Sequence, residues 1–236
     1  MNGSDYDKIA SEYYLQRHIT SRNFDSATLT SRRLVRSLLP HAGLVLELGA
    51  GKGRLEEFFD VPLSRTIQID LSMKMLRIDR KRGDRRNANR IRCDALGLPF
   101  CSESFAAVVA LLYDPYNRPR LYKEVQRVLR RGGIFIGTLP SIDWGTTLRR
   151  IRKYRVDRVR FIAKSGKKVM IDSILVGRKE LMRQVEAAGL SLNEAQQLYL
   201  PAKVQKISPD VTTPAEKLGL TPETLPLLTL VIARRK

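Results

Sequence analysis

The residues of this chain best suited to chemistry are the three glycines of the run 49–53, which directly follow a short apolar stretch. A glycine turn that ends a strand and opens a helix directs backbone N–H groups and the helix dipole at a ligand, which Gly49 and Gly51 would let the backbone approach closely. The third glycine comes one residue earlier than in a dinucleotide-binding motif. Glu47, just before the turn, would repel a pyrophosphate but suit an ammonium group. The turn therefore predicts a ligand site that is not a dinucleotide site.

Acidic, phenolic and imidazole groups near predicted strand ends are candidates for binding and proton transfer. Asp70 ends the apolar run 66–70, where an acid can accept hydrogen bonds from both hydroxyl groups of a ribose. The candidate bases are His18, Tyr113 and Asp114. The candidates for contact with a substrate are Tyr13, Tyr14, Tyr116 and Trp144. Each type of residue also serves as a helix cap, surface group or core side chain, and the sequence leaves these interpretations open.

The elements that must position these residues alternate along the chain. Helical periodicity follows the first, second and fourth apolar runs and returns at 178–188. Alternating strands and helices predict βαβ units and a mostly parallel, doubly wound α/β sheet. The first 40 residues look helical, and two apolar runs around Gly166 predict a β-hairpin. The predicted strands are 44–48, 66–70, 89–94, 106–112, 134–139 and 225–233.

Composition limits the classes of protein to consider. The chain has 236 residues, of which 43% are hydrophobic, so it can bury a core and is neither disordered nor collagen-like. Two cysteines, Cys93 and Cys101, are too few for a disulfide framework or a tetrahedral zinc site, and we expect no metal. The N-terminus lacks the apolar run of a signal peptide, and no stretch approaches about 18 apolar residues. We therefore expect a cytoplasmic protein without a transmembrane segment.

Four segments, in order along residues 44–140, together resemble the class I S-adenosylmethionine-dependent methyltransferases. The run 45–53 resembles the first motif of that family, and 69–72 with Met75 resembles its second-strand acid and following helix. The segment 94–105 resembles the part that holds adenine, and 127–133 the corner before the fifth strand. The N-terminal segment around Tyr6 and Tyr13 is similar to the lid of the branch that methylates small molecules and quinone-like lipids.

The resemblance implies S-adenosyl-L-methionine as cofactor and assigns roles to residues. Glu47 and Gly49 would lie by the methionine end, Asp70 would hold the ribose, and Asp94 would accept from the adenine amino group. Leu111 and Leu112 would line the sulfonium end. The full set of implied cofactor contacts is Glu47, Gly49, Ala50, Gly51, Asp70, Leu71, Met75, Asp94, Ala95, Leu111 and Leu112.

The resemblance also implies a Rossmann-like, seven-stranded fold within a single domain over residues 1–236. We expect a helical lid at 1–40 and a cofactor-binding half at 44–140. A basic insertion at 141–175, containing a helix or β-hairpin after the fifth strand, would cover the acceptor. A C-terminal helix and strands would fill 176–236.

The leading functional hypothesis is methyl transfer to a small-molecule or lipid-like acceptor by in-line displacement. The alternatives are an RNA or DNA methyltransferase and a methyltransferase-like subunit that binds without catalysis. The charge bears on this choice, because 43 Lys and Arg exceed 24 Asp and Glu by 19. The runs 74–92 and 149–168 carry much of that excess, which would attract an anionic acceptor or nucleic acid, or form solvated surfaces. The segment 113–117 resembles the Asp-Pro-Pro-Tyr tetrapeptide of amino-methyltransferases but lacks the second proline.

Overall fold

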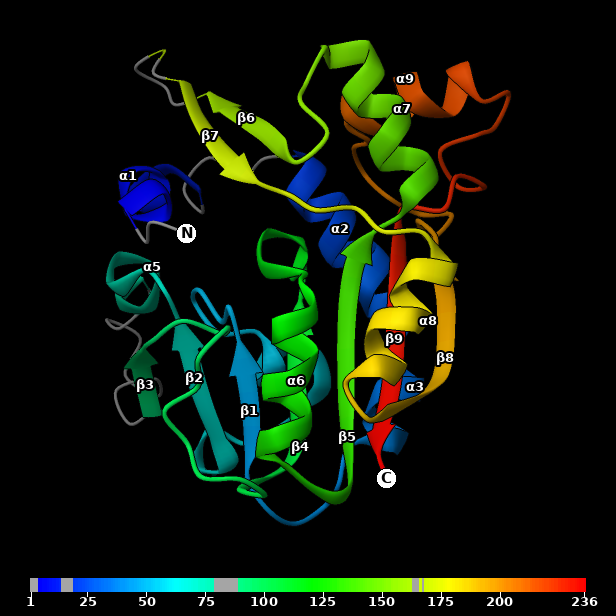
Figure 1. Ribbon diagram of the computed structural model, residues 1–236. Coiled ribbons are helices and arrows are strands. Elements are labelled where there is room, and N and C mark those ends of the chain that lie inside the picture. Colours follow the sequence, from blue (N-terminus) through cyan, green and yellow to red (C-terminus); the bar gives the residue numbers. More distant parts are fainter. Residues whose placement is uncertain (1–3, 14–18, 79–88, 163–165, 167) are drawn as a thin grey trace.

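A seven-stranded sheet organises the computed structural model, which describes residues 4–13, 19–78, 89–162, 166 and 168–236 (Figure 1). The strand order is β3-β2-β1-β4-β5-β9-β8. The five strands from β3 to β5 are parallel to one another, and β9 pairs antiparallel with both β5 and β8. The predicted α/β class is therefore confirmed. The strands are β1 (Val45–Leu48), β2 (Thr66–Asp70), β3 (Asn89–Arg92), β4 (Phe105–Leu111), β5 (Leu129–Pro140), β8 (Leu190–Leu198) and β9 (Leu228–Arg235).

Helices cover both faces of this sheet, as a doubly wound fold requires. On one face α2, α3 and α4 share a hydrophobic core with β1, β4, β5 and β9, and on the other face α6 and α8 do so. Because both faces are covered, β4 is apolar throughout and almost entirely buried. The helices are α1 (Ser4–Tyr13), α2 (Ile19–Thr30), α3 (Arg32–Leu38), α4 (Leu55–Phe59), α5 (Met73–Arg77), α6 (Pro119–Val128), α7 (Ile142–Arg152), α8 (Arg178–Ala187) and α9 (Pro209–Lys217).

Segments outside the central sheet gather over the carboxyl ends of its parallel strands (Figure 1). After β5 the chain forms α7 and then the predicted hairpin of β6 (Arg158–Ile162) and β7 (Lys168–Asp172). Helix α1 lies between this hairpin and α5, and a third hydrophobic cluster around Ile9 and Ile171 joins the three elements. The helical N-terminus and the insertion therefore meet above the sheet.

Three details differ from the sequence-based prediction. Strand β5 begins at Leu129 rather than at 134, because its first residues pair with β4 across a bulge between Phe105 and Ala107. Gly132, with φ of +70°, allows the chain to bend there. The sequence located neither β8 nor α9. Strand β8 is an edge strand with many polar residues, and α9 contains Pro214, so neither has the expected pattern.

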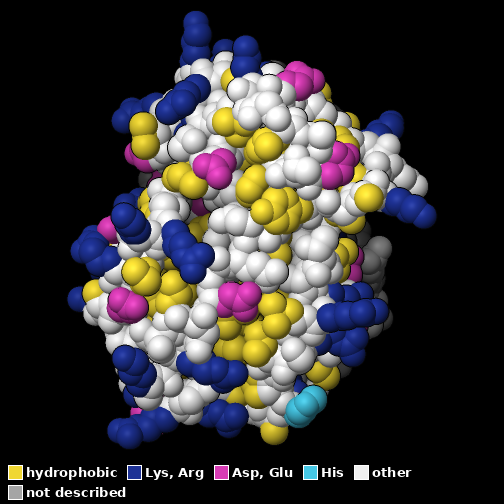
Figure 2. Space-filling model, turned by 90° about the vertical axis from the view of Figure 1, so that its right-hand side faces the viewer, with side chains coloured by type: hydrophobic (Ala, Val, Ile, Leu, Met, Phe, Trp, Pro, Cys, Tyr) yellow, Lys and Arg dark blue, Asp and Glu magenta, His cyan; other side chains and the backbone are white. Residues whose placement is uncertain are grey.

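The surface carries charge on more than the insertion. Figure 2 shows Lys and Arg side chains scattered over the face that is on the right in Figure 1, with hydrophobic side chains gathered in patches between them. No helix among the described residues is long and apolar enough to cross a membrane.

Phe135 lies at the centre of the packing that supports the functional end of β4. It is fully buried in β5, and its ring centroid lies 5.6 Å from that of Tyr113 and 6.2 Å from that of Tyr122. We expect Phe135→Ala to lower the free energy of unfolding by about 3–5 kcal/mol, because the cavity it leaves cannot close. Urea denaturation measures the change. Val156→Ala, at a residue that is 87% exposed, is the control and should stay within about 0.5 kcal/mol of wild type.

Candidate functional site

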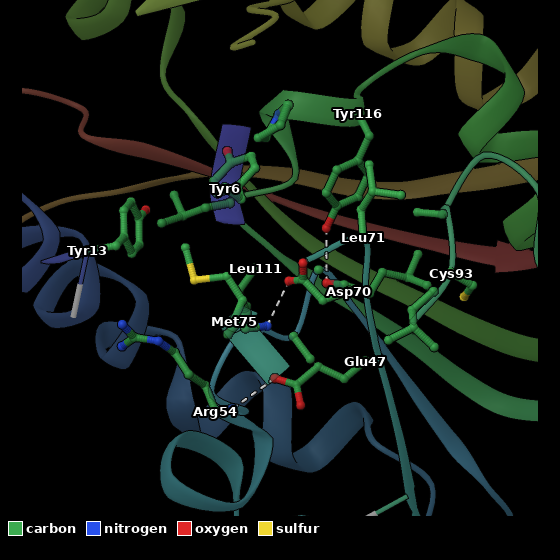
Figure 3. A pocket seen from close by; sticks show the side chains of 18 of the residues that line it. Tyr6, Tyr13, Glu47, Arg54, Asp70, Leu71, Met75, Cys93, Leu111 and Tyr116 are labelled. Carbon is green, nitrogen blue, oxygen red and sulfur yellow. Dashed lines mark hydrogen bonds between the residues drawn. The ribbon is translucent and has the colours of Figure 1, made fainter. Parts of the chain in front are cut away.

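A cavity opens at the carboxyl ends of β1, β2 and β4, where a doubly wound sheet binds its ligands. All the cofactor contacts that the family resemblance implied line this one cavity. Figure 3 labels Glu47, Asp70, Leu71, Met75 and Leu111 among them. They come from the glycine turn, the end of β2, the start of α5, the segment after β3 and the end of β4. The fold thus brings together residues that lie up to 65 positions apart in the sequence, from Glu47 to Leu112.

The glycine turn has the conformation that its sequence requires. Gly49 and Gly51 have φ of 60° and 54°, in the left-handed region that favours glycine. The N–H of Ala50 donates to the carbonyl of Ile69 at 2.8 Å, which fastens the turn to β2. A Cβ on Gly49 would lie 2.2 Å from the hydroxyl oxygen of Tyr116, so the turn also has to admit that ring.

Asp70 joins the glycine turn to α5. Its Oδ2 accepts the N–H of Gly51 at 3.0 Å and its Oδ1 accepts the N–H of Ser72 at 2.8 Å. Burial raises the pKa of Asp70, and these two backbone hydrogen bonds act in the opposite direction. Each oxygen keeps a further lone pair for a ligand, which is what binding of two ribose hydroxyls would need.

Glu47 is held more tightly by the protein than the sequence indicated. Its Oε1 accepts the N–H of Arg54 at 2.9 Å and its Oε2 accepts Nε2 of Gln68 at 2.8 Å. Burial raises the pKa of Glu47, because desolvation disfavours its charged form. Glu47 therefore positions the start of α4 as well as lining the cavity.

An ion pair that the sequence did not single out lies on the same cavity. Nη1 of Arg54 lies 2.5 Å from Oδ1 of Asp25, and its guanidinium lies 5.2 Å from the ring centre of Phe58. Asp25 comes from α2, and burial raises its pKa. In the sequence, the only sign of this ion pair is the position of Arg54 directly after the glycine turn. No pattern in α2 distinguishes Asp25 as a functional residue.

A second cavity of about 420 Å³ adjoins the first one. It lies between α2, α7, the β6–β7 hairpin and the start of α9. Four of the residues that the structure describes line both cavities, and they are Tyr6, Tyr13, Leu112 and Pro115. Leu112 has φ of 54°, which is strained for a leucine, and its N–H donates to Oγ1 of Thr138 at 3.0 Å.

Helix α1 supplies the two tyrosines of this shared wall. Asp7 fixes the helix to the start of α5, because its Oδ1 accepts hydrogen bonds from the hydroxyl of Ser72 and from the N–H of Lys74. On its other side α1 packs against the hairpin, where the ring centroids of Tyr13 and Phe161 lie 6.0 Å apart. The helix therefore spans both cavities.

Asp114 lies on the second cavity and is held in a buried polar cluster. The hydroxyl of Ser173 donates to its Oδ2 at 2.5 Å, and Nη2 of Arg149 donates to the carbonyl oxygen of Ser173 at 2.7 Å. Burial raises the pKa of Asp114 to about 6, against the smaller lowering effects of Ser173 and Arg149. A carboxyl group with this pKa can accept a proton near neutral pH.

The structure separates the other candidate residues. Tyr113 lines neither cavity, because its ring is buried in the core with Tyr122 and Phe135, and this placement argues against a role as base. Tyr116 lies on the first cavity rather than the second, and its hydroxyl donates to the carbonyl of Leu48 at 3.0 Å. Trp144 lines the second cavity, and its indole N–H donates to the carbonyl of Asp210 at 2.7 Å. The candidates His18 and Tyr14 lie outside the described residues.

The raised pKa of Asp114 predicts a pH effect on stability. The folded state holds this proton up to about pH 6, whereas an unfolded Asp releases it near pH 4, so ionisation costs stability as pH rises between these values. From pH 5 to pH 7 the wild type should lose about 1 kcal/mol more than Asp114→Asn does. Urea denaturation of both proteins at the two pH values measures this difference. Equal losses would show that Asp114 has an ordinary pKa.

Comparison with known proteins finds a matching domain family and one curated relative. Residues 45–133 match the family described as "Methyltransferase domain", a range that runs from β1 into β5. An uncharacterized protein of Methanocaldococcus jannaschii, MJ1252, is 26% identical over 180 residues. That match covers 74% of this chain, and the chain spans 65% of the length of this curated relative.

Two solved structures share the fold over almost the whole chain. One belongs to the complex between the Haloferax volcanii Trm112 methyltransferase activator and a methyltransferase, with a TM-score of 0.70, 16% identity, and coverage of 97% of this chain and 96% of that one. The other is a SAM-dependent methyltransferase from Thermotoga maritima, with a TM-score of 0.66, 20% identity and complete coverage of both chains. The family match over residues 45–133, the strand order and the cavity agree: this part of the chain is similar to a methyltransferase domain, and the chain has the Rossmann-like methyltransferase fold.

Proposed function

We propose that this methyltransferase binds its cofactor in the first cavity and methylates a small molecule held in the second. The observation that carries this proposal is the wall of four residues that the two cavities share. Donor and acceptor atoms must meet in line for a displacement reaction, and adjoining cavities allow that. The larger cavity has the volume of a small-molecule site, for which about 300–1,000 Å³ is usual.

The residues of the first cavity fit S-adenosylmethionine. Asp70 offers two buried carboxylate oxygens for the ribose, and Leu71 and Met75 offer apolar surface for the adenine. Arg54 is the cation placed to meet the carboxylate of the methionine moiety. When bound, the cofactor supplies a methyl group that the positive charge of its sulfonium has already activated.

The protein's own part in the reaction is to orient the acceptor, exclude water and receive a proton. Tyr6 and Tyr13 close the region between the cavities from above, on a helix that is fixed to α5 and the hairpin. An acceptor O–H or N–H group loses its proton when its lone pair bonds to the methyl carbon. The carboxylate of Asp114 is the group on the second cavity that can take this proton, because its pKa is raised to about 6.

The nucleic-acid alternative has weaker support than the small-molecule proposal. Its loop motif, Asp114 to Asn117, is folded into the protein, since Asn117 donates to the carbonyl of Ile174 and accepts from the hydroxyl of Tyr122. Both side-chain ends of Asn117 are thus occupied by protein groups. A role without catalysis is disfavoured by the intact glycine turn and cofactor cavity.

Asp70→Ala should weaken binding of S-adenosylhomocysteine by about 1.5–3 kcal/mol, the usual loss for hydrogen bonds to a charged group. Isothermal titration calorimetry measures the affinity. Asp70→Asn keeps one accepting oxygen and should lose less affinity. Asp157 is exposed and does not line the first cavity, so Asp157→Asn should lose no affinity. If Asp70→Ala bound as tightly as wild type, the assignment of Asp70 to the ribose would be wrong.

Filling the second cavity should stop methyl transfer without affecting cofactor binding. Ser21 lines this cavity from α2, so Ser21→Trp should abolish transfer from methyl-labelled S-adenosylmethionine, whereas Ser21→Ala should keep it. The assay uses the low-mass fraction of a cell extract and, separately, total RNA from it. Label in nuclease-sensitive RNA, unaffected by Ser21→Trp, would make the nucleic-acid alternative correct.

A further inference from the structure

The second cavity combines an apolar interior with charged groups. Aromatic and aliphatic side chains from four elements line it, among them Phe24, Trp144, Leu148, Phe161 and Ile171. The rings of Phe24 and Trp144 meet edge to face, with centroids 5.1 Å apart. These side chains suit the apolar body of an acceptor but provide no attraction for a charge.

Among the described residues, three aspartates line this cavity, and each has a cation nearby. Oδ1 of Asp210 lies 3.1 Å from Nε of Arg152. Asp172 pairs with Arg158 at 3.0 Å and with Arg118 at 3.6 Å, and neither of these two arginines lines the cavity. The third, Asp114, lies in the field of Arg149. The negative charge of the cavity wall is therefore neutralised by the protein itself.

Arginine donors, in contrast, remain unused on the same wall. Arg160 lines the cavity and has no carboxylate within 4.0 Å among the described residues; its guanidinium lies 5.6 Å from the ring centre of Tyr154. Arg149 is only 8% exposed, and its buried Nε has no hydrogen-bond partner in the described part of the chain. Arg149 has Asp114 nearby, whereas Arg160 is exposed and has no such partner within the described ranges, so its planar fork is open to an oxyanion.

We propose that the acceptor is a small amphiphile. Its apolar body enters the second cavity, and its oxyanion binds Arg160 beside Tyr154. This inference rests on the proposed function, because it names the class of molecule that the acceptor cavity takes. A nucleic-acid polymer fits less well, because its phosphates would contact exposed cations whether or not they line the cavity. Arg160 is exposed as well, but it differs from the other exposed cations in facing both the cavity and an aromatic ring.

A pair of fluorescent probes tests the inference, since 8-anilinonaphthalene-1-sulfonate and N-phenyl-1-naphthylamine differ by one sulfonate. Trp144 is the single tryptophan of the chain and lines the cavity, so energy transfer from it to either probe reports binding there. We expect the sulfonate to bind wild type about tenfold more tightly than the neutral probe. Arg160→Gln should remove about tenfold of the sulfonate affinity and leave the affinity for the neutral probe within about twofold.

Arg150→Gln is the matched control. It removes the same charge, and Arg150 lies on the exposed side of α7 and does not line the cavity. It should change neither affinity. Equal losses in Arg160→Gln and Arg150→Gln would overturn the inference, as would a 20-nucleotide RNA that displaces the sulfonate and is weakened equally by both variants. Titration of the same samples with S-adenosylhomocysteine separates the two proposals. Absence of that binding, with the expected probe results, would refute the proposed function and leave the oxyanion site standing.

Discussion

The carboxylate of Asp70 is the interaction on which the functional end of this protein depends. One of its oxygens holds the glycine turn at Gly51 and the other holds the start of α5 at Ser72. The hydroxyl of Ser72 in turn donates to Asp7, so α1 is fastened to the same point. The burial that makes this carboxylate costly in isolation also strengthens each of its hydrogen bonds. A single acid thus joins the cofactor turn to the helix that closes both cavities.

The cofactor half was predictable because its determinants are local. A glycine turn after an apolar run, an acid at the end of the next run and a capping serine are each set by a few neighbouring residues. The cap is present as predicted, since Oγ of Ser72 accepts the N–H of Met75. The hairpin of the insertion was equally visible, because two alternating runs flank Gly166.

The region around the second cavity depends on tertiary placement, which the sequence alone does not show. Tyr113 and Tyr116 are three residues apart, yet one is packed against Phe135 and the other lies over Gly49. The 3-10 turn η3 (Asp114–Tyr116) points the two rings in different directions, and no periodicity in the sequence predicts this turn. Arg54 and Asp25 meet although 29 positions separate them, and Arg160 differs from its basic neighbours only through what surrounds it. For the same reason, counting charges along the chain did not single out Arg160.

The two cavities are built by different parts of the chain, which has a consequence for how proteins of this fold can diverge. Most of the second cavity is built by α1, α2, α7, the hairpin and α9, which lie outside the segment from β1 to β5. Substitutions at Phe24, Trp144 or Arg160 can therefore reshape the second cavity while the glycine turn and Asp70 stay as they are. A lineage with this fold can change the shape of the second cavity through substitutions in these outer elements, while the first cavity keeps its lining unaltered.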